Sequence, residues 1–136
     1  MAFVPDDTWY NKNMDSKINK FLYWTPRILS IIFIVFLSLF SLDVFDMKLG
    51  FWGTILGLFM HNIPVFILAI VLWISWRREI VGGIVFTSAG LFYGVIMSLE
   101  MLKDSSERGM ISAISLIALP ALIIGILFII NWLKKR

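Results

Sequence analysis

The residue types best suited to chemistry gather around His61, in the middle of the apolar stretch from Gly53 to Trp76. His61 is the chain's single histidine, Asn62 follows it, and Pro64 lacks a backbone N–H donor. In a helix, His61 lies roughly 14 Å from the outer end of this stretch. Ionisable side chains that deep in a membrane are costly and usually face protein or a water-filled cavity. The sequence predicts a polar intramembrane site at His61, with a structural interhelical hydrogen bond as the alternative.

Two acidic residues extend this candidate site. Asp43 and Glu100 each lie near the outer end of an apolar stretch, and Tyr93 shares a helical face with Glu100. Together with His61, these residues can line an outward-facing cleft that relays protons or binds a cation or a small polar ligand. The alternative is that each acid simply reaches the lipid headgroups from a helix end.

Several site classes are disfavoured by the residues that the chain contains. Cysteine is absent, which excludes disulfides and thiolate metal sites, and a lone histidine argues against structural zinc. We therefore predict no metal, no catalytic residue and no enzymatic activity. Haem bound through His61 is a minor alternative, because it needs a second axial ligand. The basic residues lie at the ends of apolar segments, so no nucleic-acid partner is expected.

The elements that position these residues are transmembrane helices. Of 136 residues, 60% are hydrophobic and 15% are charged, which suits lipid better than water for a chain of this size. Apolar spans are predicted at 26–46, 52–76, 80–101 and 110–133, each about long enough to cross the bilayer. Residues 1–24 are predicted to form a cytoplasmic segment with a short amphipathic helix on the membrane surface. The expected class is an all-α membrane protein with four antiparallel helices in one bundle.

The second and fourth spans resemble each other at an offset of 56 residues. Pro64 then aligns with Pro120 and Trp76 with Trp132, whereas His61 aligns with Ile117. This similarity predicts two tandem helical hairpins, with helix kinks at both prolines. Glycines along the spans predict close helix packing, because they let backbones approach. The glycines assigned this role are Gly53, Gly57, Gly90, Gly94 and Gly125.

The distribution of basic residues predicts the orientation of the chain. Nine lysines and arginines fall on the side of the termini and three on the other side. The positive-inside rule then places both termini in the cytoplasm of a multi-pass inner-membrane protein.

Three short motifs carry a resemblance to a known group of proteins. H-N-I-P at 61–64, W-R-R-E at 76–79 and the pair Gly82-Gly83 resemble a family of small, uncharacterised prokaryotic membrane proteins with four helices. The resemblance covers the four spans and implies no established activity. From the residues themselves we expect an oligomeric transporter or channel-like protein for protons, cations or a small polar solute. The alternative is a non-enzymatic subunit or assembly factor of a larger membrane complex.

Overall fold

The computed structural model describes residues 7–103 and 107–136, and these ranges contain helices and short turns without a strand. The helix α1 (Asp7–Leu39) continues into the 3-10 helix η1 (Phe40–Met47). The helices α2 (Gly50–Ser75) and α3 (Glu79–Lys103) follow. The last helical rod consists of α4 (Glu107–Ala113), the π-helix η2 (Ile114–Ala118) and α5 (Leu119–Lys135).

Four of these helical segments are long and apolar enough to cross a membrane. They are Asn11–Met47, Gly50–Ser75, Glu79–Lys103 and Ile111–Lys135. The prediction of an all-α protein with four membrane-spanning helices is therefore confirmed. Within the predicted polar turn at 103–109, residues 104–106 lie outside the described part of the chain, as do residues 1–6.

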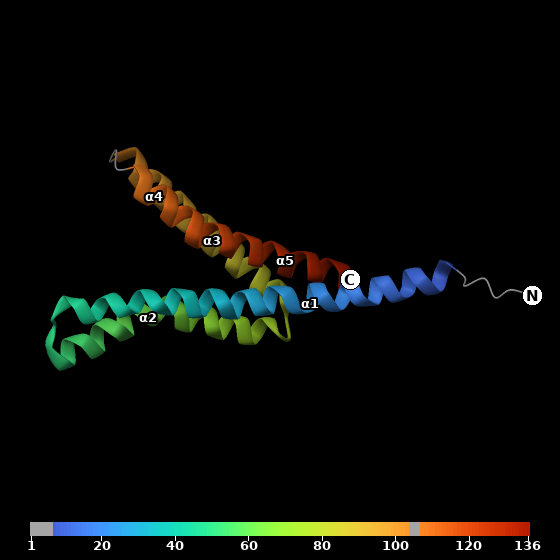
Figure 1. Cartoon of the computed structure of the whole chain (residues 1–136), viewed down its shortest axis with the longest axis horizontal. Coiled ribbons are helices and arrows are strands. Elements are labelled where there is room, and N and C mark those ends of the chain that lie inside the picture. The colour runs from blue at the N-terminus through green and yellow to red at the C-terminus, as the bar shows by residue number, and fades with distance from the viewer. Residues whose placement is uncertain (1–6, 104–106) are drawn as a thin grey trace, which may run out of the picture.

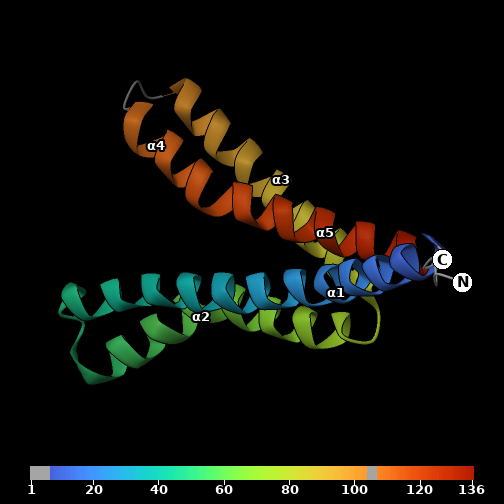
Figure 2. The same cartoon turned by 45° about the vertical axis from the view of Figure 1, so that its right-hand side comes forward.

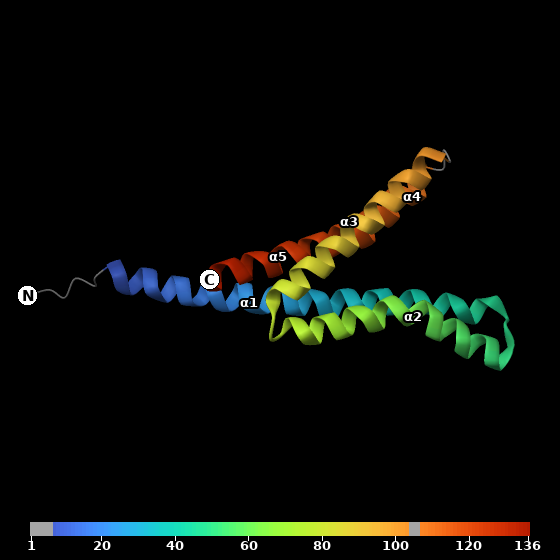
Figure 3. The same ribbon diagram turned by 180° about the vertical axis from the view of Figure 1, so that it is seen from behind.

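The helices form two hairpins arranged as a V. One hairpin consists of α1 and α2, and the other of α3 with α4, η2 and α5 (Figure 1). The hairpins meet near the end of the molecule that carries both termini, and they diverge toward their opposite tips (Figures 2 and 3). Packing is most extensive between α3 and α5, while α1 contacts α5 and α2 contacts α3. The closed end of the V is therefore where all four long helices come together.

The first helix differs from the expected short surface helix followed by a separate span. It runs without interruption through Pro26, and residues 14–21 form exposed turns of the same helix, whereas Leu22 and Tyr23 are half-buried. Two hydroxyl groups donate to carbonyls beside the proline, from Thr25 Oγ1 to Phe21 O (2.7 Å) and from Ser30 Oγ to Pro26 O (2.6 Å). The carbonyl that loses its donor at Pro26 is that of Leu22, four residues earlier, so these two side-chain bonds reinforce the turns on either side of the proline and do not replace the missing bond.

The two aligned prolines have different effects on their helices. Pro120 follows directly after the π-helix η2. A proline ring crowds the carbonyl four residues earlier, and a wider π turn relieves that contact. Pro64 lies inside α2, which remains α-helical around it and bends away from α1 in its first half (Figure 2).

The core lies between the hairpins and contains large side chains from all four long helices. Phe86 of α3 and Phe128 of α5 are fully buried and stack with their ring centroids 6.2 Å apart. In lipid, such rings stabilise the fold through close van der Waals packing rather than through removal from water. The buried cluster also includes Phe33, Leu68, Val71, Leu72, Ala121 and Ile124.

Glycines permit the close approach of α3 and α5. A Cβ atom on Gly125 would lie 2.5 Å from the backbone N of Thr87, and one on Gly90 would lie 3.1 Å from the carbonyl O of Ala118. Gly94 is less crowded, because a Cβ atom there would lie 3.7 Å from Ala118 Cβ. These three glycines lie where the sequence predicts close packing.

The glycines of α2 behave differently. A Cβ on Gly57 would lie 2.7 Å from Val44 Cγ1 of η1, so this glycine does meet another helix. The Cβ of Gly53 would meet only Leu49, a neighbour in the chain, among the described residues. On α2, Gly57 therefore packs closely against η1, within the first hairpin.

Candidate functional site

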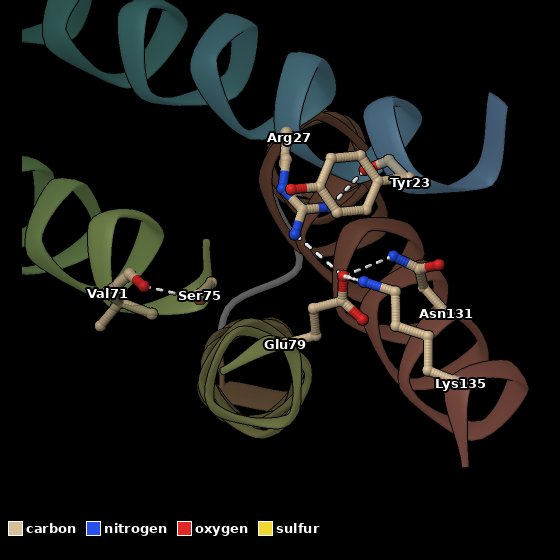
Figure 4. Close-up of polar contacts among 7 residues, drawn as sticks. All are labelled: Tyr23, Arg27, Val71, Ser75, Glu79, Asn131 and Lys135. Carbon is tan, nitrogen blue, oxygen red and sulfur yellow. Dashed lines mark hydrogen bonds and ion pairs between the residues drawn. The ribbon is translucent and has the colours of Figure 1, made fainter. Parts of the chain in front are cut away.

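A buried ionic cluster joins the two hairpins at the closed end of the V (Figure 4). Glu79 Oε1 accepts hydrogen bonds from Arg27 Nη2 (2.9 Å), Asn131 Nδ2 (2.9 Å) and Lys135 Nζ (2.6 Å). The side chains of Arg27 and Glu79 are only 2% and 5% exposed. One carboxylate oxygen thus ties together α1, α3 and α5, and we call this cluster of Arg27, Glu79, Asn131 and Lys135 the clamp.

Local helix geometry explains why these residues meet. Tyr23 and Arg27 are four residues apart on α1, and Asn131 and Lys135 are four apart on α5, so each pair shares one helix face. Glu79 is the first residue of α3, after a turn that brings the helix start between α1 and α5. A carboxylate at a helix N-terminus is also stabilised by the helix dipole.

An aromatic ring completes the environment of the buried arginine. Arg27 Cζ lies 3.5 Å from the centroid of the Tyr23 ring, and Arg27 Nη1 donates to the carbonyl O of Tyr23. Lys135 Nζ lies 4.5 Å from the centroid of the same ring. Cations over an aromatic face are attracted to its negative quadrupole, more strongly when water is excluded. Tyr23 and Glu79 therefore compensate the charge of Arg27 from two sides.

The clamp has the chemistry of a structural contact. A buried charge is tolerated only when it is paired and hydrogen-bonded, and removal of one partner leaves the other uncompensated. Glu79, Asn131 and Lys135 belong to the second hairpin and Arg27 belongs to the first, so the Arg27–Glu79 ion pair is the clamp contact that crosses between the hairpins. The clamp therefore holds the closed end of the V together.

The histidine predicted to centre the site lies on the outer surface of this single chain. His61 is exposed near the middle of α2, and Asn62 beside it is half-buried. Asn62 Nδ2 donates to Leu58 O at 2.9 Å. Within the described residues, neither the imidazole of His61 nor the Asn62 side-chain oxygen has a hydrogen-bond partner.

The acidic residues do not join His61 in one cleft within a single chain. Asp43 is exposed on η1, which contacts α1 and α2 but not α3 in the described structure. Glu100 lies in the last turn of α3, near the open tip of the second hairpin, and pairs with Lys103 at 3.0 Å. Tyr93 is half-buried on α3. The described residues contain no group of three or more His, Asp or Glu side chains that could hold a metal ion.

Sequence reasoning missed the clamp because it interpreted its members one at a time. Arg27 and Glu79 lie at the ends of predicted apolar spans, and Asn131 lies within the span 110–133, so none of the three stands out as a site residue in the sequence. One signal was present, since the offset of 56 residues that aligns Trp76 with Trp132 also aligns Glu79 with Lys135. Opposite charges at equivalent positions of a repeat can meet near its symmetry axis.

The fold and the clamp together define a multi-pass all-α membrane protein built from two hairpins that share a buried ionic cluster. Residues 14–136 match a family described as a domain of unknown function (DUF7670). Because this match spans most of the sequence, the chain belongs to that family. Comparisons with curated proteins and with solved structures find no match.

Proposed function

We propose that the protein is an oligomeric transporter or channel-like protein whose polar site forms where α2 helices of two copies meet. The observation that carries this proposal is the outward exposure of His61 near the middle of a membrane-spanning helix. An ionisable side chain there is disfavoured against lipid and favoured against protein or a water-filled path. A second copy of α2 supplies such a surface.

The hydrogen-bonding groups of α2 support a contact between identical helices. An imidazole offers one donor and one acceptor, and the unpaired side-chain oxygen of Asn62 is an acceptor. In a two-fold interface, His61 of each copy can therefore donate to Asn62 of the other. An imidazole can both donate and accept a hydrogen bond, so this pair of contacts suits the passage of protons, cations or a small polar solute. Asp43, on η1 of the same hairpin as α2, would then act near the outer end of this path, whereas Glu100 and Tyr93 lie on α3 of the other hairpin.

The proposed setting is a bacterial or archaeal inner membrane with both termini in the cytoplasm. Its support is the excess of basic residues on the terminal side of the four spans. No catalytic step is proposed.

A flux measurement tests the proposal. The full chain, reconstituted in liposomes that contain a pH-sensitive dye, should carry protons or cations, and His61→Ala should abolish this flux. Phe66→Ala, a change at another exposed residue of α2, is the control and should retain it. Full flux through His61→Ala, or no flux through the unchanged chain, contradicts the transport role.

A cross-linking measurement tests the interface separately. The chain lacks cysteine, so Val65→Cys introduces one thiol four residues from His61, on the same face of α2. Oxidation should then give disulfide-linked dimers, whereas Ile84→Cys on α3 should remain monomeric on the same gel. Equal cross-linking at both positions would argue against a specific α2 contact.

A second candidate function, a non-enzymatic subunit of a larger complex, rests on a different observation. A pocket of about 330 Å³ opens between α1 and the α5 rod, and its eight lining residues are all apolar. A transmembrane helix of a partner protein fits such a surface, since helices in lipid associate through close apolar packing. Isolation of a stoichiometric partner chain with the gently solubilised protein would favour this role. The lining residues are Leu29, Ile32, Phe33, Phe36, Leu116, Pro120, Ile123 and Ile124.

A further inference from the structure

A second pocket lies beside the clamp, at the end of the molecule that carries both termini. Its volume is about 290 Å³, and its walls come from α1, from the turn between α2 and α3, from the start of α3, and from α5. Three helices and one turn thus surround this pocket where the apolar spans end. The lining residues are Tyr23, Trp76, Arg77, Arg78, Glu79, Ile80, Trp132 and Lys135.

The charge of this pocket is strongly positive. Of its eight lining residues, Glu79 alone is acidic, and its Oε1 atom already accepts bonds from Arg27, Asn131 and Lys135. Arg77 and Arg78 are exposed, and neither guanidinium has a hydrogen-bond or ion-pair partner among the described residues. These two planar guanidinium groups can donate paired hydrogen bonds to the oxygen atoms of a phosphate group in the pocket.

The rest of the surface favours a lipid over a soluble phosphate. Trp76 and Trp132 line the pocket at the ends of their spans, the level at which tryptophan meets lipid headgroups. An adjoining hollow, also about 290 Å³, combines Arg77 and Arg78 with Trp73 and Ile74. Trp73 is 75% exposed, so an apolar wall extends from the two arginines along α2 into the bilayer. An amphiphilic anion can contact the two arginines with its charged group and the apolar wall at Trp73 with its hydrocarbon part.

We propose that this pocket binds the phosphate of an anionic phospholipid, with Arg77 and Arg78 as its ligands and Trp73 against the start of an acyl chain. Basic pockets between transmembrane helices are suited to such headgroups, and the predicted cytoplasmic side faces the more anionic leaflet. The proposal concerns a surface distinct from the α2 contact around His61 and does not depend on transport.

Native mass spectrometry of the full chain in a neutral detergent tests this site. The protein is titrated with phosphatidylglycerol, with zwitterionic phosphatidylcholine, and with phosphatidylglycerol in the presence of inorganic phosphate. Phosphatidylglycerol should bind more tightly than phosphatidylcholine, and equimolar inorganic phosphate should leave it bound. Arg77→Gln with Arg78→Gln should weaken phosphatidylglycerol binding about 25-fold, since each interfacial cation contributes about fivefold.

Matched variants separate the site from general charge effects and from misfolding. Lys17→Gln with Lys20→Gln removes the same charge from exposed residues of α1 and should change the affinity by less than about threefold, because those charges are screened at a distance. Arg77→Lys with Arg78→Lys keeps the charge but removes the planar guanidinium donors, so it should weaken binding less than the glutamine pair does. Helical circular dichroism reports that every variant is folded.

Three results would overturn the proposal. The two glutamine pairs could weaken binding equally, which would mean that only net charge matters. Phosphatidylcholine could bind as tightly as phosphatidylglycerol, which would mean that the headgroup charge is not recognised. Inorganic phosphate could displace the lipid at equal concentration, which would identify a soluble anion as the ligand.

Discussion

The clamp at Glu79 predicts a large loss of stability from a single isosteric change. Glu79→Gln keeps the size of the side chain but removes the negative charge that faces Arg27 at 2.9 Å. Arg27 is 2% exposed, so its charge would remain buried without a counter-ion. Breaking a buried ion pair in this way typically costs about 3–5 kcal/mol. The expected result is a fall of that size in the free energy of unfolding.

The chain provides a matched control for this change. Glu100 also forms an ion pair, with Lys103 at 3.0 Å, but the side chains of Lys103 and Glu100 are 71% and 49% exposed. Glu100→Gln should therefore cost less than about 1 kcal/mol. Unfolding in mixed micelles with increasing denaturing detergent, followed by circular dichroism, measures both variants under the same conditions. Equal stability losses in the two variants would refute the reasoning.

A double-mutant cycle identifies the partner of Glu79. Arg27→Gln and Glu79→Gln are measured singly and together, and the pair should lose less stability than the sum of the single changes. The expected coupling energy is about 1–3 kcal/mol, since the two groups are in direct contact. Additive losses would mean that Glu79 acts mainly through Asn131 or Lys135.

Two further predictions follow from packing and topology. Gly125→Val should destabilise the chain by about 1–3 kcal/mol, because its Cβ would meet the backbone of Thr87. Gly109→Ala meets no atom of the described residues within 4 Å and should be tolerated, and the same micelle assay compares the two variants. If the termini are cytoplasmic, a membrane-impermeant thiol reagent should label Lys48→Cys in intact cells and Lys134→Cys only after the cells are permeabilised. The reverse labelling pattern would overturn that topology.

The architecture was predictable because lipid imposes a simple rule on sequence. Each span must be long and apolar, so the four helices could be located from hydropathy alone. Hydropathy did not predict where the backbone of a helix continues through a proline or widens before one. Pro26 predicts a helix start, yet α1 continues through it, and the π turn before Pro120 depends on how strain is distributed among neighbouring residues.

The site was harder to predict because contacts between helices do not leave a periodic signal. Arg27 and Glu79 are 52 residues apart, and nothing in the hydropathy of either span relates them. His61 stands out in sequence as a polar residue in an apolar stretch, but sequence does not say whether its face of α2 points inward. In the folded chain that residue is exposed, and the buried polar contacts lie at Glu79.

The way in which the clamp links distant parts of the chain also constrains its biogenesis. Transmembrane helices leave the ribosome in order, so Arg27 is made well before Glu79, and Asn131 of α5 comes later still. The first hairpin alone therefore holds Arg27 without its carboxylate partner. That carboxylate arrives with the first residue of α3, and Asn131 and Lys135 reach it only when α5 has been made. The last helix in the order of synthesis therefore completes the clamp.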